Sequence, residues 1–282
     1  MATLQAGSRL ALANKESLVV GGELVTGMAQ PGQIVPVDSE HSAIAQALRS
    51  GQPQEVRRLI LTASGGPFHG RSKDQLQDVS LDQALAHPTW SMGRVVTINS
   101  ATMVNKGLEL IEAGLLFGVD WDCIEVVIHP QSIIHSMVVF SDGSTIAQCS
   151  PPNMRLPIGV ALGWPNRLDD NLDACDFSQP TSWTFTPLDC VTFPAVELAR
   201  LAGRLGQTVP AVFNAANEVC VDRFCRAEIS FGTIVDTVEE IVGTYVDQHL
   251  DEAITGSTMT LDDIRRADSW ARRAAESIKE TA

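Results

Sequence analysis

Short apolar runs along the first half of the chain predict β-strands. Each run ends in small or polar residues, and strands of this length rich in aliphatic side chains are typical of a sheet core. The runs are Leu10 to Ala13, Val56 to Thr62, Val95 to Ile98 and Ile124 to Ile128. Helical spacing lies between them, at Ile44 to Leu48 and Ala101 to Phe117. The alternation predicts an α/β fold, a central sheet with flanking helices.

The pattern changes twice in the second half of the chain. Ser136 to Ser150 alternates around Asp142-Gly143, a pair that predicts a hairpin and therefore antiparallel strands. Trp164 to Cys190 has no sustained period and is rich in Pro, Asp, Asn and Ser, so we interpret it as a linker. Apolar residues then recur every three or four positions, which predicts a small C-terminal helical bundle. Its helices are expected at Phe193 to Leu201, Pro210 to Arg226, Ile234 to Leu250 and Leu261 to Ile278.

Composition narrows the class of protein. With 282 residues and 44% apolar content, the chain is long enough to bury a sizeable core. Its formal net charge of −14 would repel a phosphate backbone, so we expect no nucleic-acid partner. Residues 164–282 carry 20 acidic and 10 basic residues and form the more acidic part.

The six cysteines form no C-x-x-C pair, and we expect free thiols in a reducing compartment. Met1 to Lys15 does not read as a signal peptide, and no apolar run approaches the roughly 20 residues that span a bilayer. We therefore expect a cytoplasmic protein with no membrane association.

A first candidate site is Val37-Asp38-Ser39-Glu40-His41, between an apolar pair and a helical segment. Two carboxylates two residues apart at the end of an extended segment can point to one side and hold a metal. The alternative is structural, because Asp and Ser cap helices and acidic side chains favour the first turn.

A second candidate is Thr97 to Ser100, predicted as a strand end, followed by a helix through Glu109. Asn105, Lys106 and Glu109 fall within about 100° of one another on that helix. A solvated surface with a Lys–Glu pair at three-residue spacing explains this polar face equally well.

Three further segments follow or connect predicted strands. Ser64-Gly65-Gly66 could cradle an anion through exposed backbone N–H groups, although an ordinary turn fits as well. His87 to Gly93 contains Trp90 and could close over a ligand, or Trp90 could belong to the core. Asn14 to Ser17 follows the first strand, where α/β sheets place ligand-binding groups. Together these segments suit a hard cation and a phosphorylated polyol, because carboxylate oxygens favour Mg²⁺ or Mn²⁺ over zinc.

Six motifs resemble those of the 1-deoxy-D-xylulose 5-phosphate reductoisomerase family, in its order and at its approximate spacing. They are LALANKES at 10–17, PVDSEH at 36–41, TASGGPF at 62–68, HPTWSMG at 87–93, NSATMVNKGLE at 99–109 and HPQSIIH at 129–135. The resemblance implies an NADPH-dependent rearrangement and reduction of 1-deoxy-D-xylulose 5-phosphate to 2-C-methyl-D-erythritol 4-phosphate, in non-mevalonate isoprenoid synthesis. We also expect a homodimer.

The resemblance assigns a role to each matching residue. Asp38, Glu40 and Glu109 would hold Mn²⁺ or Mg²⁺, and Lys15, Glu40 and His87 would be the catalytic groups. Asn14, Glu16 and Gly93 would touch NADPH. The sugar-phosphate substrate would contact Lys15, Ser39, Glu40, Ser64, His87, Trp90, Ser100, Asn105, Lys106 and Glu109.

One departure from the family is that no G-x-G-x-x-G turn occurs. We therefore expect residues 1–37 to be the remnant of a dinucleotide-binding domain, 38–163 a central catalytic and metal-binding domain, 164–190 a linker and 191–282 a C-terminal helical domain. By itself the chain is expected to bind metal without oxidising NADPH. Two alternatives stay open: a metal-dependent sugar-phosphate isomerase or binding module, and a structural fragment that dimerises through the predicted hairpin.

Overall fold

Two compact units make up the chain, and each is assembled from separate segments of the sequence. The computed structural model describes residues 1–169, 172–249 and 259–278. Unit 1 contains Met1–Lys15, Gly27–Ser64 and Leu116–Leu188, and unit 2 contains Glu16–Thr26, Gly65–Leu115 and Asp189–Ala282. The domain limits expected from the sequence at residues 37, 163 and 190 stay a prediction. No helix within the described ranges is both long and apolar enough to cross a membrane.

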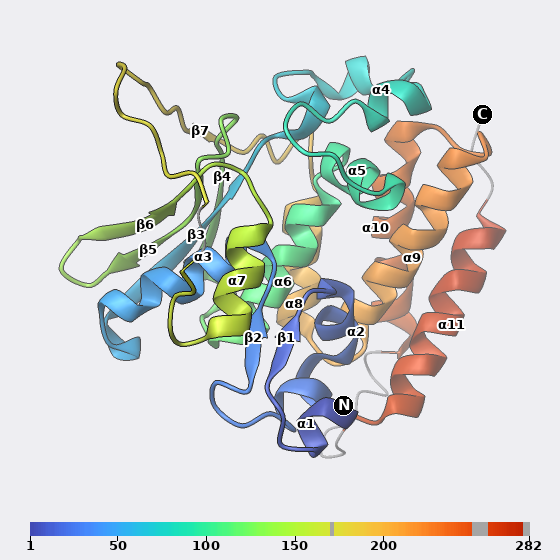
Figure 1. Ribbon diagram of the computed structural model, residues 1–282. Helices are drawn as coiled ribbons and strands as arrows, with labels where there is room; N and C mark the ends of the chain where they lie inside the picture. The colour runs from blue at the N-terminus through green and yellow to red at the C-terminus, as the bar shows by residue number, and fades with distance from the viewer. Residues whose placement is uncertain (170–171, 250–258, 279–282) are drawn as a thin grey trace. The chain divides into compact units, whose positions relative to one another are not determined.

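Unit 1 contains a mixed five-stranded sheet in the order β6-β5-β3-β4-β7 (Figure 1). β3 runs parallel to β4 and antiparallel to β5, while β5 pairs with β6 and β4 with β7, both antiparallel. The strands are β3 (Val56–Ala63), β4 (Ile124–Ile128), β5 (Ile134–Phe140), β6 (Thr145–Cys149) and β7 (Thr186–Pro187). The expected hairpin is confirmed, with Gly143 at a φ of +89° in its turn. The short β7 lies inside the segment expected to be a linker.

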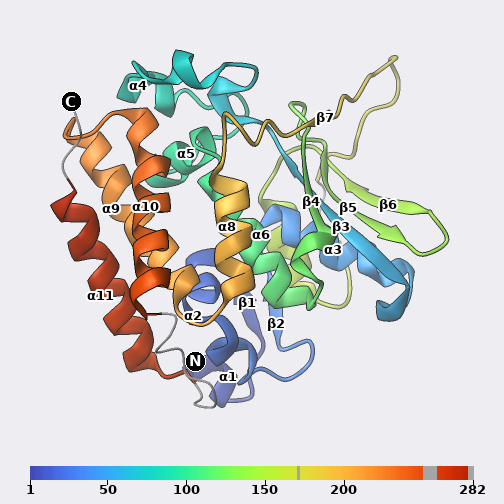
Figure 2. The same cartoon turned by 180° about the vertical axis from the view of Figure 1, so that it is seen from behind.

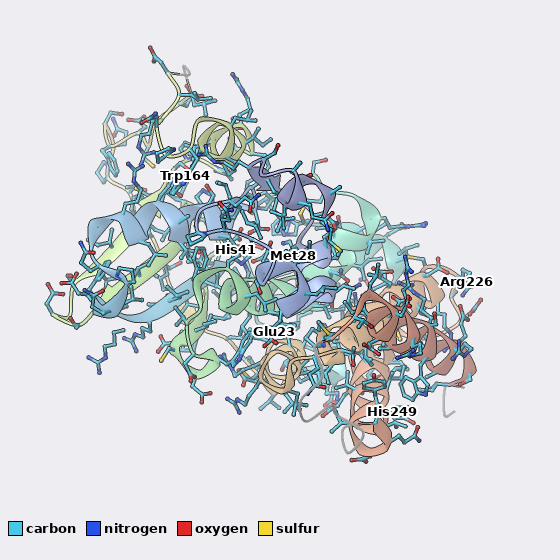
Figure 3. All side chains as sticks on the ribbon, turned by 90° about the horizontal axis from the view of Figure 1, so that it is seen from below. Glu23, Met28, His41, Trp164, Arg226 and His249 are labelled. Atoms are coloured by element: carbon cyan, nitrogen blue, oxygen red, sulfur yellow. The ribbon has the colours of Figure 1, made fainter. Side chains whose placement is uncertain are left out.

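A second, two-stranded sheet in unit 1 pairs β1 (Leu10–Leu12) with β2 (Ile34–Pro36) in parallel. A small apolar cluster forms beside it from Val35, Val37 and Ala161, against which Trp164 packs (Figure 3). Helix α3 (Ser39–Ala47) packs on β5 and β6, and α7 (Arg155–Gly163) packs on α3 and the small sheet. Leu59 and Leu61 of β3 and Val138 of β5 are buried and contribute to the apolar core at the larger sheet. The helix expected at Ile44 to Leu48 is thereby confirmed, beginning earlier, at Ser39.

Unit 2 is helical, and α9 lies at its centre, in contact with α5, α8, α10 and α11 (Figure 2). All four helices expected in the second half are present: α8 (Ala195–Leu205), α9 (Val209–Cys225), α10 (Phe231–His249) and α11 (Leu261–Ser277). Apolar side chains at helical spacing, such as Phe213 and Ile234, are buried between them. Phe231 stacks edge-on against Phe68 and Phe224, with ring centroids 5.1 and 5.7 Å apart.

The remaining elements are shorter or connect the larger ones. Most of α2 (Lys15–Thr26) belongs to unit 2, and its helix is kinked at Gly22. The others are α1 (Ala2–Gln5), α4 (Leu81–Leu85), α5 (Arg94–Ala101), α6 (Val104–Phe117) and the 3₁₀ turns η1 (Leu48–Ser50), η2 (Pro53–Glu55), η3 (Gly66–Phe68), η4 (Lys73–Leu76) and η5 (Trp121–Cys123).

One predicted strand is wrong. Val95 to Ile98 is the middle of helix α5, so Thr97 to Ser100 is a helical segment and not a strand end. Four consecutive apolar or β-branched residues fit a buried strand and a buried helix equally well. Here Thr97 donates a side-chain hydrogen bond to the carbonyl of Gly93, and Ile98 and Asn99 are buried inside unit 2. Tertiary packing therefore decided the conformation of this segment.

Candidate functional site

Asp38 begins helix α3 and caps it. Its Oδ1 accepts a hydrogen bond of 3.2 Å from the backbone N–H of Glu40, so the structural role expected of this residue is real. The segment differs from the sequence expectation in one respect. Glu40 lies in the first turn of α3 and not in an extended segment, so a helix turn, and not strand alternation, brings the two carboxylates to one side, with one oxygen of each within 4.8 Å of the other. Ser39 donates a side-chain hydrogen bond to the carboxylate of Glu40.

Two cationic or titratable side chains of unit 1 hold Asp38 in place. Lys15 Nζ lies 2.6 Å from Asp38 Oδ2, and His41 Nδ1 lies 3.1 Å from Asp38 Oδ1. Burial by itself would raise the pKa of Asp38, but the Lys15 ammonium and His41 outweigh it and leave that pKa well below its usual value. Asp38 is therefore a carboxylate at neutral pH, as a metal ligand must be.

His41 is a contributor to this site that the sequence analysis did not assign. It is fully buried on α3, three residues after Asp38 (Figure 3). The signal was available, since residues three apart on a helix are neighbours and His41 belongs to the same motif. The sequence could not show whether His41 is solvated or buried. Its burial in the structure is what allows it to orient Asp38.

In unit 2, helices α5 and α6 meet at Met103, whose φ of +64° breaks the helical path. The expected helix from Ala101 to Phe117 therefore begins at Val104. Beyond the break, Asn105 Nδ2 donates to Glu109 Oε1 at 2.6 Å, and Lys106 pairs with the other oxygen of Glu109. Ser100 lies one turn before the break, near the end of α5.

Burial distinguishes the two explanations of this polar helix face. Lys106 is 5% and Glu109 2% exposed, so the face is not a solvated surface. A buried ammonium–carboxylate pair costs desolvation free energy that geometry and further hydrogen bonds must offset. Here Asn105 supplies one such bond to the carboxylate. The cluster of Asn105, Lys106 and Glu109 is therefore an organised polar site inside unit 2.

The glycine pair after β3 has a conformation that other residues avoid. Gly65 and Gly66 have φ values of +88° and +64°. A Cβ at Gly66 would lie 2.9 Å from the carbonyl oxygen of Ser100, so this loop passes against the end of α5 within unit 2. Ser64, the residue before the pair, belongs to unit 1 and is half-buried.

The segment from His87 to Gly93 is organised by the imidazole of His87. Its Nδ1 accepts hydrogen bonds from the backbone N–H groups of Thr89 (3.1 Å) and Trp90 (2.9 Å). Because Nδ1 is the acceptor, the neutral ring carries its proton on Nε2. Burial lowers the pKa of His87, which favours this neutral form. Trp90 is half-buried, so it is neither a core residue nor fully solvated.

The residues assigned to NADPH lie at the ends of helices. Asn14 precedes α2 and Glu16 lies in its first turn, while Gly93 caps the N-terminus of α5. Nothing lies within 4 Å of a Cβ placed on Gly93, so the backbone there is open to a ligand.

The two units divide the assigned residues between them. Unit 1 contains Asn14, Lys15, Asp38, Ser39, Glu40 and Ser64, and unit 2 contains Glu16, His87, Trp90, Gly93, Ser100, Asn105, Lys106 and Glu109. Within unit 1 the structure brings Lys15 to Asp38, and within unit 2 it brings Asn105 and Lys106 to Glu109.

Comparison with known protein families gives two matches along the chain. Residues 34–117 match the 1-deoxy-D-xylulose 5-phosphate reductoisomerase C-terminal domain, and residues 149–274 match the DXP reductoisomerase C-terminal domain. The first match contains Asp38, Glu40 and Glu109, and the second contains α7 to α10 and most of α11.

Several curated relatives are similar over nearly the whole chain. The 1-deoxy-D-xylulose 5-phosphate reductoisomerase of Cutibacterium acnes is 60% identical over 99% of this chain and 70% of its own length. That of Paenarthrobacter aurescens is 61% identical over 96% of this chain and 67% of its own length. The chain thus spans about 70% of the length of these relatives.

Solved structures give the same result. A DOX-P reductoisomerase in complex with NADPH, fosmidomycin and magnesium is similar with a TM-score of 0.89 and 38% identity, over 98% of this chain and 71% of that one. The reductoisomerase of Zymomonas mobilis in complex with NADPH has a TM-score of 0.87 and 40% identity, over 100% of this chain and 71% of that one.

Proposed function

Because this chain belongs to the 1-deoxy-D-xylulose 5-phosphate reductoisomerase family, we propose that it provides the metal- and phosphate-binding part of that enzyme. The activity is the rearrangement of 1-deoxy-D-xylulose 5-phosphate and its reduction to 2-C-methyl-D-erythritol 4-phosphate, with NADPH as the hydride donor. The main observation in support is that Asp38 and Glu109 each lie in an organised polar cluster, Asp38 with Lys15 and Glu109 with Asn105.

Asp38, Glu40 and Glu109 are proposed to hold the divalent metal together. The donor set fits, because three carboxylates offer only oxygen ligands and Asp38 is kept ionised. When bound, the metal supplies Lewis-acid polarisation of the substrate's carbonyl and hydroxyl oxygens. Lys15 and His41 orient Asp38, and Asn105 and Lys106 orient Glu109.

The substrate's phosphate is proposed to bind where α5 gives way to α6. Lys106 and Asn105 lie in the first turn of α6, and the N-terminus of a helix favours an anion. Ser100 and Ser64 add hydroxyl groups. Binding free energy from this distant group holds the reacting carbons in position, which explains why so many residues serve a phosphate that does not react.

Lys15, Glu40 and His87 are proposed to act on the sugar itself. Lys15 and Ser39 bind its hydroxyl groups, and His87, whose Nδ1 is occupied by Thr89 and Trp90, contacts the substrate in its neutral form. Trp90 on the same loop excludes water from the bound substrate. Asn14, Glu16 and the open backbone at Gly93 contact NADPH.

A chimera with a longer relative tests this function, because the relative supplies the part of the enzyme that lies outside the match. The matching 70% of the Cutibacterium acnes relative is replaced by residues 1–282, and NADPH oxidation is followed by absorbance with Mn²⁺ and 1-deoxy-D-xylulose 5-phosphate. We expect turnover that requires both additions and is abolished by Asp38→Asn. The matched control is Glu125→Gln, a surface carboxylate on β4 paired with Arg58. A folded chimera that binds Mn²⁺ without oxidising NADPH would contradict the proposal.

We also propose that the protein is cytoplasmic and forms a homodimer. All six cysteines are free thiols, as is usual in a reducing compartment. β6 is an edge strand of the larger sheet, and an exposed edge offers unpaired backbone groups to a second chain.

A further inference from the structure

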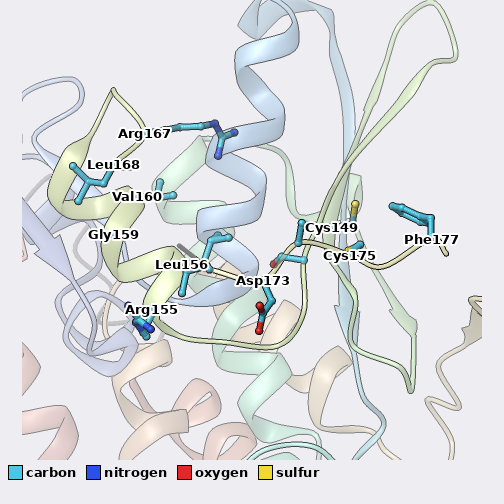
Figure 4. Close-up of a pocket in the computed structure, with 13 residues that line it drawn as sticks. Cys149, Arg155, Leu156, Gly159, Val160, Arg167, Leu168, Asp173, Cys175 and Phe177 are labelled. Carbon is cyan, nitrogen blue, oxygen red and sulfur yellow. The ribbon is translucent and has the colours of Figure 1, made fainter. Parts of the chain in front are cut away.

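A cavity of about 430 Å³ lies within unit 1, apart from the residues assigned to the metal and the substrate. Its wall is formed by the end of β6, by one face of α7 and by the segment that follows α7. Leu156, Val160 and Leu168 supply apolar surface (Figure 4). Two cysteines, Cys149 and Cys175, lie together on its opposite side.

The two thiols come from distant elements and lie side by side in the cavity wall (Figure 4). Cys149 is the last residue of β6, paired with Ile134 of β5, and it is exposed. Cys175 belongs to the irregular segment beyond α7 and is half-buried. Both side chains line the same cavity and are neighbours there, and Cys149 contributes to the raised pKa of Cys175 (Figure 4). A disulfide requires two cysteines whose side chains can approach each other, and the shared cavity brings this pair together from separate elements.

The environments of the two thiols differ. Burial raises the pKa of Cys175, and the neighbouring Cys149 raises it further, so Cys175 stays protonated at neutral pH. Cys149, on an exposed strand end, is the group that a small reagent meets first. Cys220 provides a contrast, because burial on α9 raises its pKa to about 12 and shields it.

We propose that Cys149 and Cys175 form a redox-sensitive thiol pair, which a low-molecular-weight disulfide of the glutathione type converts to an intramolecular disulfide. The Cys149 thiolate attacks one sulfur of the oxidant, forms a mixed disulfide and releases one thiolate. Cys175 then loses its proton to solvent and attacks Cys149 Sγ, which releases the second thiolate. Two protein thiols are oxidised, and one small disulfide is reduced to two thiols.

The product would tie the end of β6 to the segment beyond α7. Both ends of the link line the cavity, so oxidation fixes one of its walls. Cross-linking two elements restricts the unfolded chain and stabilises the fold. The consequence is a unit 1 that is more resistant to heat when oxidised and returns to its original stability after reduction.

The test equilibrates the whole chain with oxidised and reduced glutathione at defined ratios, alkylates the remaining thiols and maps the linkages by mass spectrometry. Combined cleavage at basic and acidic residues makes the map unambiguous. Arg155 separates the proposed partners, Asp142 separates Cys123 from Cys149, and Asp176 separates Cys175 from Cys190.

We expect one dominant linkage, Cys149 to Cys175, accompanied by a rise in melting temperature that dithiothreitol reverses. Cys175→Ser should instead accumulate glutathione on Cys149, whereas the control Cys190→Ser should leave the linkage unchanged. Cys175→Ala takes the place of Cys175→Ser if the serine variant fails to fold, and Cys149→Ala should remove the linkage. Wild-type protein that stops at the mixed disulfide, or that links other cysteines as readily, would overturn the proposal.

Discussion

At the scale of single residues, Glu109 is one of the three carboxylates of the proposed metal site. Glu109→Gln removes one of three negative charges that offset the partial dehydration of the cation. We expect the affinity for Mn²⁺ to fall by about tenfold or more, measured by isothermal titration calorimetry. The control Glu125→Gln changes the same chemical group at the surface and should leave the affinity unchanged. Equal affinity in both variants would rule out Glu109 as a ligand.

Lys106 is proposed to bind the substrate's phosphate and not NADPH, so its replacement should affect the binding of these two ligands differently. In the active chimera, Lys106→Ala should raise the KM for the sugar phosphate far more than the KM for NADPH. A hydrogen bond to a charged group is worth about 1.5 to 3 kcal/mol, or about ten- to 150-fold. Lys73→Ala removes an exposed lysine paired with Asp236 and serves as the control. If both constants rise equally in Lys106→Ala, general misfolding is the cause.

The lowered pKa of His87 predicts that the stability of the loop carrying Trp90 depends on pH. Burial lowers the pKa of this base, so the unfolded chain binds more protons than the folded one as the pH falls below the usual histidine value. The stability that neutral His87 confers is full above that value and is lost as the pH falls towards the lowered pKa. Protonation of Nδ1 also removes the acceptor for Thr89 and Trp90. NMR titration should show a pKa below that of histidine in an unfolded peptide, with the neutral ring protonated on Nε2. A neutral ring protonated on Nδ1 would contradict this assignment.

At the scale of elements, the close approach of the η3 loop to α5 explains why a glycine is needed at position 66. Gly66→Ala must accommodate both a φ of +64° and a Cβ 2.9 Å from the Ser100 carbonyl oxygen. Gly70→Ala meets a similar φ of +84° with nothing within 4 Å. Urea denaturation should show a loss of about 1 to 2 kcal/mol in the free energy of unfolding for Gly70→Ala. Gly66→Ala should lose about 1 kcal/mol more from the clash. Equal losses would show that the loop moves freely away from α5.

At the scale of the whole molecule, the exposed edge of β6 is the surface on which a homodimer is proposed. Lysines on an edge strand oppose pairing with another chain. Thr145→Lys combined with Ala147→Lys places two charges on exposed positions of β6 and should shift the protein towards monomer in analytical ultracentrifugation. Thr244→Lys combined with Gln248→Lys adds the same charge to exposed positions of α10 and should not. An unchanged assembly in the β6 variant would place the interface elsewhere.

The sequence by itself determined the order of most elements and the chemistry of the site. The Asp142-Gly143 turn, the strands at β1, β3 and β4 and the four helices from α8 to α11 followed from local pattern, because periodicity and turn chemistry are properties of neighbouring residues. The six motifs identified the family for the same reason, since each is contiguous.

Only the tertiary structure decided which residues are buried and which distant residues meet. It made a helix of Val95 to Ile98, since an apolar run of that length fits either a strand or a helix until its partners are known. It buried Lys106 with Glu109, although their spacing suited a solvated surface equally well. It also brought Cys149 and Cys175 to one cavity, although α7 separates their elements in sequence. Burial and long-range contact depend on how elements pack, and no local pattern contains that information.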